Sequence, residues 1–136
     1  MMTIEFVWRG GFDSAEVNLL HSQAFETPVA TYDNREWRSL VGRHSLGWAT
    51  ARSGGRLVGF VNVAWDGLAH AWIQDTMVQA ASRHQGIGTQ LIIVAREASR
   101  QAGCEWLHVD FDEELGDFYY QACGFAPTSA GLIRLE

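Results

Sequence analysis

Hydrophobic and polar positions repeat at two different periods along the chain, and the change of period marks the predicted elements. A period of two is typical of strands, and a period near 3.6 is typical of helices. Strands are predicted over 4–8, 48–52, 56–65, 69–78, 105–111 and 132–135. Helices are predicted over 14–25, 37–44, 88–102 and 114–122. This order predicts one mixed α/β (α+β) domain over 1–136, in which helices cover the faces of a sheet.

Local signals support the middle of this order. Asp66-Gly67 favours a two-residue hairpin, because this pair readily adopts the positive φ angles of a type I′ turn. An apolar stripe at helical spacing follows, and Gly103 is placed to end that helix. The stripe consists of Leu91, Val94, Ala95, Ala98 and Ala102. The chain should therefore pass from a meander of strands into an amphipathic helix.

Composition and charge narrow the class of protein. With 136 residues, 47% of them apolar, the chain is long enough for one globular domain without disulfides. It shows no signal peptide and no apolar run of roughly 20 residues, so we expect a cytoplasmic protein with no membrane partner. The net charge of −6 argues against nucleic acid as a partner and is compatible with a cationic substrate. Cys104 and Cys123 lack metal-ligand spacing, so no metal site is expected.

A glycine-containing segment lies between the third meander strand and the long helix. It reads Arg83-His84-Gln85-Gly86-Ile87-Gly88. Backbone N–H groups at a helix start can hold a pyrophosphate, because the free donors and the helix dipole favour an anion there. The glycines permit close approach, and Arg83 can add a charge-assisted contact. The segment alone also fits a strand-to-helix connection without a ligand.

Two motifs at matching spacing resemble the GNAT acetyltransferase family. The cofactor motif of that family, V-x-x-x-x-R-x-x-G-I-G-x-x-L, is matched by Val78, Arg83, Gly86, Ile87, Gly88 and Leu91. Its second motif, F-Y-x-x-x-G-F, is matched by residues 119–125, with Tyr119 in place of the first Phe. The resemblance implies the GNAT fold, a mixed central sheet of six to seven strands flanked by about four helices. It also implies an N-acetyltransferase that uses acetyl-CoA as co-substrate.

The resemblance further implies where the cofactor lies. In such enzymes the third meander strand and the strand after the long helix splay apart, and the pantetheine arm occupies the gap. The implied cofactor-binding residues are Met77, Val78, Arg83, His84, Gln85, Gly86, Ile87, Gly88, Thr89 and Tyr120. The amine then attacks the thioester directly, and the poor placement of the two cysteines as nucleophiles agrees with this.

Direct attack needs a base for the ammonium and an acid for the leaving thiolate. The resemblance makes Tyr120 the acid; a packing role for Tyr120, or donation by Tyr119, is the alternative. The family offers no fixed base. Asp75 interrupts an apolar strand, and a partly buried carboxylate there would have a raised pKa, while His108 and Asp110 share one face of the next strand. The alternatives are that Asp75 has a purely structural role and that His108 and Asp110 are polar residues at a solvated strand end.

One position departs from the family pattern. Family members often have an asparagine seven residues before the motif tyrosine, and this asparagine bonds the pantetheine. The chain has Glu113 at that position, within an acidic run that suits a helix start. Pantetheine contacts from this segment are therefore not expected to follow the family.

The acceptor is the least constrained part. The connection between the first two helices is acidic and carries Glu26, Tyr32, Asp33 and Glu36, beside Arg35 and Trp37. Carboxylates beside aromatic rings suit a small cationic primary amine. The rivals are a protein- or peptide-directed N-acetyltransferase and a catalytically silent acyl-CoA-binding module. Trp37, Trp48 and Trp72 either wall a closed pocket or belong to the core, and a homodimer stays open.

Overall fold

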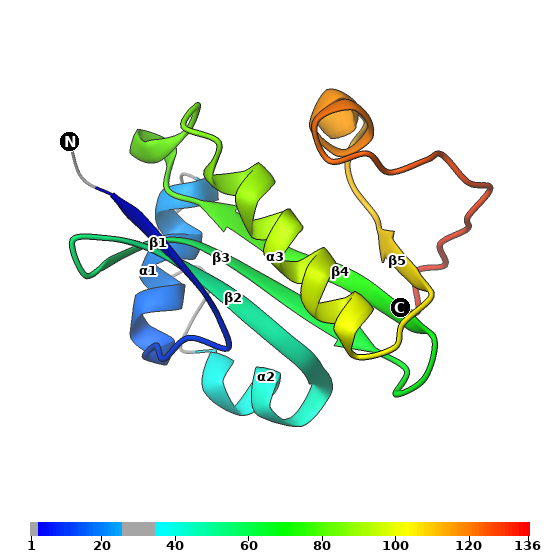
Figure 1. Cartoon of the computed structure of the whole chain (residues 1–136), viewed down its shortest axis with the longest axis horizontal. Helices are drawn as coiled ribbons and strands as arrows, with labels where there is room; N and C mark the ends of the chain where they lie inside the picture. The colour runs from blue at the N-terminus through cyan, green and yellow to red at the C-terminus, as the bar shows by residue number, and fades with distance from the viewer. Residues whose placement is uncertain (1–2, 26–34) are drawn as a thin grey trace.

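The computed structural model describes residues 3–25 and 35–136. Its main elements follow in the order β1 (Ile4–Trp8), α1 (Ser14–Phe25), α2 (Trp37–His44), β2 (Ser45–Ser53), β3 (Arg56–Trp65), β4 (His70–Val78), α3 (Ile87–Gln101) and β5 (Trp106–Val109). Short helical turns complete the described part, namely η2 (Ala80–Ser82), η3 (Glu113–Leu115) and the π-helical η4 (Asp117–Ala122). The strands form one sheet in the order β1-β2-β3-β4-β5, antiparallel except for the parallel pair β4 and β5 (Figure 1). The predicted mixed architecture is confirmed.

Two hydrophobic cores lie on opposite faces of the sheet, and alternation along β3 separates them. Val61 and Val63 pack with Leu91 of α3 on one face. Phe60, which directly precedes Val61 in β3, packs with Leu20 of α1 on the other face. In Figure 1, α3 crosses in front of the strands and α1 lies behind them. Period-two alternation thus places each strand side chain against a different helix layer.

Trp37 anchors the first two helices to the sheet. Its ring is buried and meets Phe60 edge to face, with centroids 6.0 Å apart. The indole N–H donates to Oδ1 of Asn18 on α1 at 2.9 Å, and the guanidinium of Arg35 lies 5.4 Å from the ring centroid. Trp37 is therefore a core residue, and the expectation that it offers a face to a cationic acceptor is wrong. Glu26, Tyr32 and Asp33 lie outside the described residues.

The turn between β3 and β4 differs from the type I′ hairpin predicted at Asp66-Gly67. Gly67 has a φ of +79°, but Asp66 does not have the positive φ that a type I′ turn requires. The Asp66 carboxylate instead accepts hydrogen bonds from the backbone N–H of Leu68 at 2.8 Å and of His70 at 3.1 Å. These bonds stabilise a four-residue connection, because an aspartate can bond to the backbone that follows it.

The parallel pair β4 and β5 separates halfway. Pairing runs from His70 with Trp106 to Ile73 with Val109, where β5 ends. β4 continues to Val78, so its second half, residues 74–78, does not pair with β5. This is the split that the resemblance implies.

The prediction of a C-terminal strand over 132–135 is wrong. The chain has no helix or strand after η4, so the described sheet has five strands rather than six or seven. A strand needs a neighbour for its backbone groups, and residues 132–135 pair with none of the described strands. Among the described helices, none has the length and hydropathy needed to cross a bilayer.

Candidate active site

The glycine-containing loop places the N-terminus of α3 at the surface of the protein. Gly86 is the N-cap residue with a φ of +76°, and His84 before it has a φ of +66°. No side chain caps α3. The first bond along the helix runs from Gln90 N–H to the Gly86 carbonyl at 3.0 Å, so the N–H groups of residues 87–89 have no partner within α3. These backbone donors are what an anion requires.

Hydrogen bonds connect the loop and the residues before it to neighbouring elements. The backbone N–H of Gln79 donates to the Val58 carbonyl at 2.8 Å, and the Ser82 hydroxyl donates to the Gln79 side-chain oxygen at 3.0 Å. The Arg83 guanidinium donates to the carbonyl of Ala24 at the end of α1. The loop is therefore tied to both β3 and α1, and phosphate contact by Arg83 stays a prediction.

Glycine is favoured at positions 86 and 88 of the loop for different structural reasons. A Cβ at Gly86 would meet nothing within 4 Å, so only its positive φ disfavours other residues. A Cβ at Gly88 would lie 3.1 Å from the ring of Phe118 in η4 and 3.7 Å from Val78. Gly88 thus permits η4 to pack on the first turn of α3. Gly86 is the cleaner position at which to test anion binding.

The split between β4 and β5 is bordered by residues of η4. Tyr119 is 6% exposed, and its hydroxyl lies 3.4 Å from Oγ1 of Thr76 on the free half of β4. Burial raises the pKa of Tyr119, so this phenol stays protonated near neutral pH. Tyr120 is 41% exposed, and its ring meets Phe111 edge to face at 5.1 Å. The π-helical turn therefore gives the two adjacent tyrosines different surroundings.

Asp75 lies at an irregularity of β4. The register of β3 and β4 shifts between Phe60 and Asn62, and Asp75 opposite this shift has a φ of +55°. A non-glycine residue with positive φ in a strand is strained, and such strain concentrates at functional sites. Nδ2 of Asn62 donates to Oδ2 of Asp75 at 3.2 Å, and the Ser45 hydroxyl donates to the Asn62 oxygen. The buried amide of Asn62 thus fixes a half-buried carboxylate.

His21 of α1 interacts electrostatically with this carboxylate, and the sequence interpretation missed it. Burial is the main cause that lowers the pKa of His21; the charge of Arg35 lowers it further, and the charge of Asp75 opposes the shift. The imidazole is therefore neutral near pH 7. The signal in the sequence was its position, one residue after the core residue Leu20 and therefore at the margin of the helix face that meets the sheet.

His108 and Asp110 line the same groove but have different neighbours. Nε2 of His108 lies 2.7 Å from Nδ1 of His70, and the His108 ring stacks on Trp72 with centroids 5.0 Å apart. Asp110 follows the end of β5 and, with Glu113, lines a groove of about 770 Å³ beside that strand. The structure thus bonds His108 to another histidine, and a relay through Asp110 stays a prediction.

The cysteines are poor nucleophiles in this structure. Burial raises the pKa of the Cys104 and Cys123 thiols, which keeps both protonated near neutral pH. Cys104 precedes β5 and Cys123 follows η4, and both pack against the core that α3 covers. Neither thiol is activated by its surroundings.

A split parallel pair beside an uncapped helix start defines a class of α/β domain that can hold an extended phosphate-bearing molecule. The Acetyltransferase (GNAT) family model matches residues 15–125. The chain therefore belongs to the GNAT acetyltransferase family, and the protein is an acetyltransferase. No curated protein matches the chain at a significant level.

Solved structures agree with this fold. An acetyltransferase from Trypanosoma brucei superposes with a TM-score of 0.79 at 23% identity, covering 98% of this chain and 99% of the other. An aminoglycoside N-acetyltransferase in complex with CoA gives a TM-score of 0.73 at 17% identity, covering 100% and 96%. A ribosomal-protein-alanine N-acetyltransferase from Brucella melitensis gives 0.71 at 22% identity, covering 98% and 100%. At these identities the likeness shows the fold alone.

Proposed function

We propose that the protein transfers the acetyl group of acetyl-CoA to the primary amine of a small, positively charged acceptor, within a ternary complex. The observation that carries this proposal is the strained, hydrogen-bonded Asp75 beside the split of β4 and β5. The ammonium first loses one proton to a base and becomes the nucleophilic amine. The amine nitrogen then bonds to the acetyl carbon, and the C–S bond of the thioester breaks. The nitrogen loses a second proton, and the CoA thiolate gains one.

Acetyl-CoA supplies the activated thioester, and the chain supplies the binding site for acetyl-CoA. The backbone amides of residues 85–89 would hold the pyrophosphate at the start of α3. The free half of β4, including Met77 and Val78, would pair with the pantetheine amides, because its backbone has left β5. One aminoglycoside N-acetyltransferase with this fold was solved with a bisubstrate analogue that joins CoA to acetylneamine, at 15% identity and a TM-score of 0.76. A bisubstrate analogue bound by a protein with this fold supports direct attack here.

Tyr120 is the proposed acid for the leaving thiolate. Its hydroxyl is accessible to a ligand because the residue is partly exposed, and its ring is positioned by Phe111 just after β5. Asp75 is the proposed base, with Asn62 orienting its carboxylate. His21 of α1, whose pKa the charge of Asp75 influences, is a second candidate base. The His108 and Asp110 pair is a further candidate.

A cationic acceptor is favoured by charge. The chain has a net charge of −6, and Asp75 places a carboxylate beside the proposed point of attack. Such a field attracts cations and repels anions. A screen for CoA release over polyamines, aminoglycosides, other amines and peptides tests the proposal. Release with a small cationic amine is expected; release only with peptides would favour a protein-directed enzyme, and binding without release would favour a silent module.

The pH profile of kcat/KM identifies the base. Asp75→Asn should lower kcat/KM roughly 10- to 100-fold and move or remove its acidic limb, because the proton acceptor is lost. If His21 were the base, its lowered pKa would place the acidic limb below the ordinary histidine value of about 6.5, with activity lost as pH falls through it. His21→Gln would then remove that limb. Unchanged profiles in Asp75→Asn, Asp110→Asn and His108→Gln would exclude all three residues as the base and would leave His21 or bulk deprotonation of the amine.

The salt dependence of kcat/KM tests the charge of the acceptor. Since the Debye length shortens from about 30 Å at 0.01 M salt to about 8 Å at 0.15 M, steering of a cation by the protein field should weaken. We expect kcat/KM for the best acceptor to fall several-fold over this range while kcat changes little. A neutral acceptor of similar size is the control. An insensitive rate, or a best acceptor that is acidic, would exclude the cationic preference.

A further inference from the structure

The last turn of α1 is hydrogen-bonded to the segment that leads into the glycine-containing loop. The Arg83 guanidinium donates to the Ala24 carbonyl, and Nε2 of Gln79 donates to Oε1 of Gln23 at 3.2 Å. Ala24 is only 3% exposed and Gln79 only 9%, so little water competes for these bonds. Two neighbouring residues of α1 therefore hold the two ends of the segment 79–83.

Arg83 supplies a cap that α1 does not contain in its own sequence. The last four carbonyl groups of a helix have no partner within the helix, and the helix dipole favours a cation near them. α1 has no basic residue in its last turn. The Arg83 guanidinium, bonded to the Ala24 carbonyl, provides both the missing donor and the missing charge. The arginine of the cofactor motif is thus already used by a helix of the chain itself.

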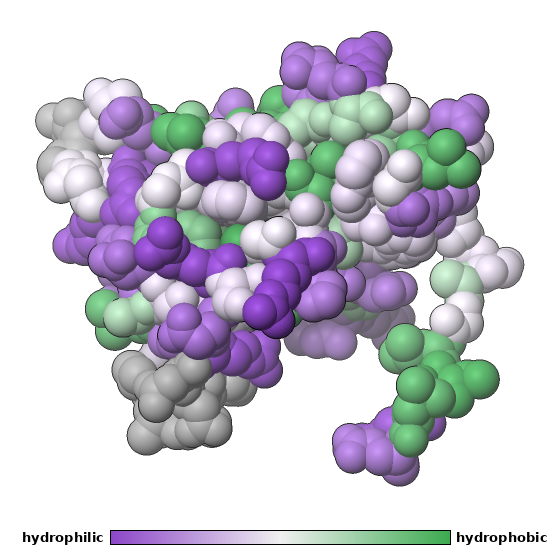
Figure 2. All heavy atoms as spheres, turned by 90° about the horizontal axis from the view of Figure 1, so that it is seen from below, coloured by the Kyte–Doolittle hydropathy of each residue, from purple (hydrophilic) through white to green (hydrophobic). Residues whose placement is uncertain are grey.

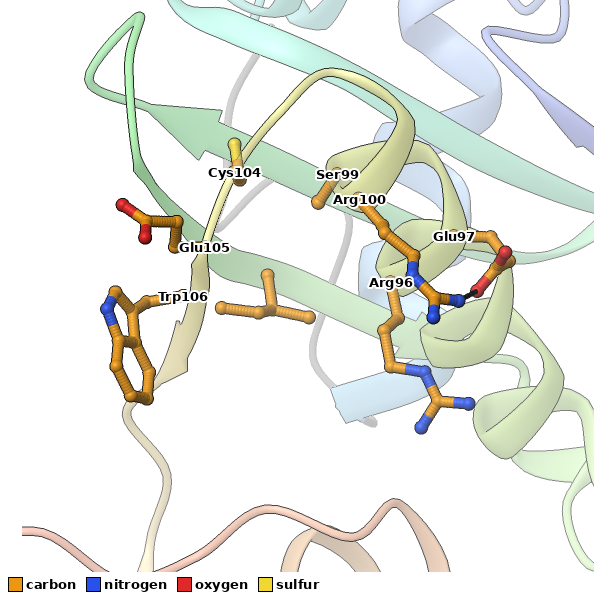
Figure 3. Close-up of a pocket in the computed structure, with 8 residues that line it drawn as sticks. Arg96, Glu97, Ser99, Arg100, Cys104, Glu105 and Trp106 are labelled. Carbon is orange, nitrogen blue, oxygen red and sulfur yellow. Dashed lines mark hydrogen bonds and ion pairs between the residues drawn. The ribbon is translucent and has the colours of Figure 1, made fainter.

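The arginines of α2 and α3 lie away from this junction. Arg38 and Arg43 belong to α2, which lies below the strands in Figure 1, whereas the glycine-containing loop lies above them. Figure 2 views the molecule from the α2 side and shows hydrophilic side chains across it. Arg96 follows Ile87 by nine residues, about 14 Å along α3, and Figure 3 shows Arg96 and Arg100 at the hollow between α3 and β5. None of these four can replace Arg83 between α1 and the loop.

α1 connects this junction to the proposed site of proton transfer. His21, a candidate base, precedes Ala24 by three residues, which is nearly one helical turn, and the charge of Asp75 acts on His21. On the buried face of α1, Ala24 shares a core with Met77 of the free half of β4. A shift of the last turn of α1 would therefore move a candidate base and disturb the packing beneath the split strand.

We infer that Arg83 is a positioning residue, whose guanidinium holds the end of α1 against the glycine-containing loop while backbone amides alone hold the pyrophosphate. Its effect on the acceptor rests on the proposed function, in which the amine reacts beside Asp75 and α1. Loss of the Arg83 cap frees the last turn of α1, so the acceptor should bind less well. Acetyl-CoA should lose little affinity, because no bond to its phosphates is removed. The motif arginine of this chain thus acts on acceptor affinity rather than on cofactor affinity.

Two measurements on Arg83→Met test this role without any acceptor. Calorimetry should show acetyl-CoA affinity within about threefold of wild type, whereas a lost charge-assisted bond to phosphate would cost about tenfold or more. Hydrogen–deuterium exchange of the amides in the last turn of α1 should become about tenfold faster, because that turn loses its cap. A tenfold loss of acetyl-CoA affinity, or unchanged exchange at the end of α1, would overturn the inference. Both results hold their meaning even if the proposed acetyl transfer to an amine fails.

Kinetics at saturating acetyl-CoA then separate positioning from general stability. Arg83→Met should raise the KM of the best acceptor about tenfold and change kcat by less than about threefold. Arg52→Met is the matched control, because Arg52 bonds Glu16 at 2.8 Å in the first turn of α1 and its loss loosens the other end of that helix. Arg52→Met should lower the melting temperature and leave the acceptor KM unchanged. Equal KM values in the two variants would overturn the inference.

Gln23→Met provides a second variant at the same junction. It removes the bond from Gln79 on the α1 side, and its partly exposed position allows the chain to fold. The acceptor KM should rise in the same direction as in Arg83→Met, with acetyl-CoA affinity unchanged. If Arg83→Met does not fold, Gln23→Met decides by the same comparison with Arg52→Met, and an unchanged acceptor KM would refute the positioning role.

Discussion

Tyr120→Phe is expected to lower kcat roughly 10- to 1,000-fold, the range typical for loss of one acid–base group. The ring and its contact with Phe111 are kept, so the affinity for acetyl-CoA should stay near the wild-type value. Loss in kcat at constant affinity is the signature of an interaction made in the transition state. Steady-state kinetics with the best acceptor, together with calorimetry for acetyl-CoA, measure both quantities.

Tyr119→Phe is the matched control for this experiment. It removes an adjacent phenol that is buried and bonded to Thr76, so it should reduce stability more than turnover. The deleted bond corresponds to about 1 kcal/mol of the free energy of unfolding. A larger loss of kcat in Tyr119→Phe than in Tyr120→Phe would transfer the acid role to Tyr119. Undiminished turnover in both would leave thiolate protonation to solvent.

Gly86→Val is expected to weaken acetyl-CoA binding by roughly 10- to 100-fold, equivalent to one lost hydrogen bond to a charged group. The side chain would stand at the start of α3, where the backbone amides face the pyrophosphate, and the positive φ would be strained by about 1–3 kcal/mol. Calorimetry of acetyl-CoA binding measures the effect.

Gly67→Val separates this effect from backbone strain. Gly67 has a φ of +79° and, like Gly86, no atom within 4 Å of a Cβ position, but it lies in the turn between β3 and β4. Both variants should melt at a lower temperature by similar amounts, and only Gly86→Val should lose affinity. Equal affinity in the two variants would contradict the phosphate-binding role of the loop.

Period and motif spacing predicted most of the fold because they are local properties. β1, α1, α2 and β3 occupy the predicted ranges, and the bounds of α3 and β4 differ from prediction by one residue at one or both ends. The predicted C-terminal strand failed for the opposite reason. Alternation in residues 132–135 reports that the segment can be a strand, whereas forming one depends on a neighbour that no sequence pattern specifies.

The candidate site was predictable only in part. Asp75 was identifiable because a carboxylate interrupts an apolar strand, and the loop of α3 because its glycines follow a motif. The bulge that strains Asp75, its bond from Asn62 and the nearness of His21 depend on the register between β3 and β4 and on helix packing. The π-helical turn that separates the two tyrosines likewise has no sequence signature.

The packing of Phe118 on Gly88 has an evolutionary consequence. Gly88 belongs to the cofactor motif, and Phe118 directly precedes the second motif, thirty positions further along the sequence. A Cβ on Gly88 would nevertheless lie 3.1 Å from the Phe118 ring. A larger residue at 88 leaves too little room for an aromatic ring at 118. Among homologues the two positions should therefore covary, with glycine at 88 wherever 118 is aromatic and alanine or serine accompanied by a smaller residue at 118.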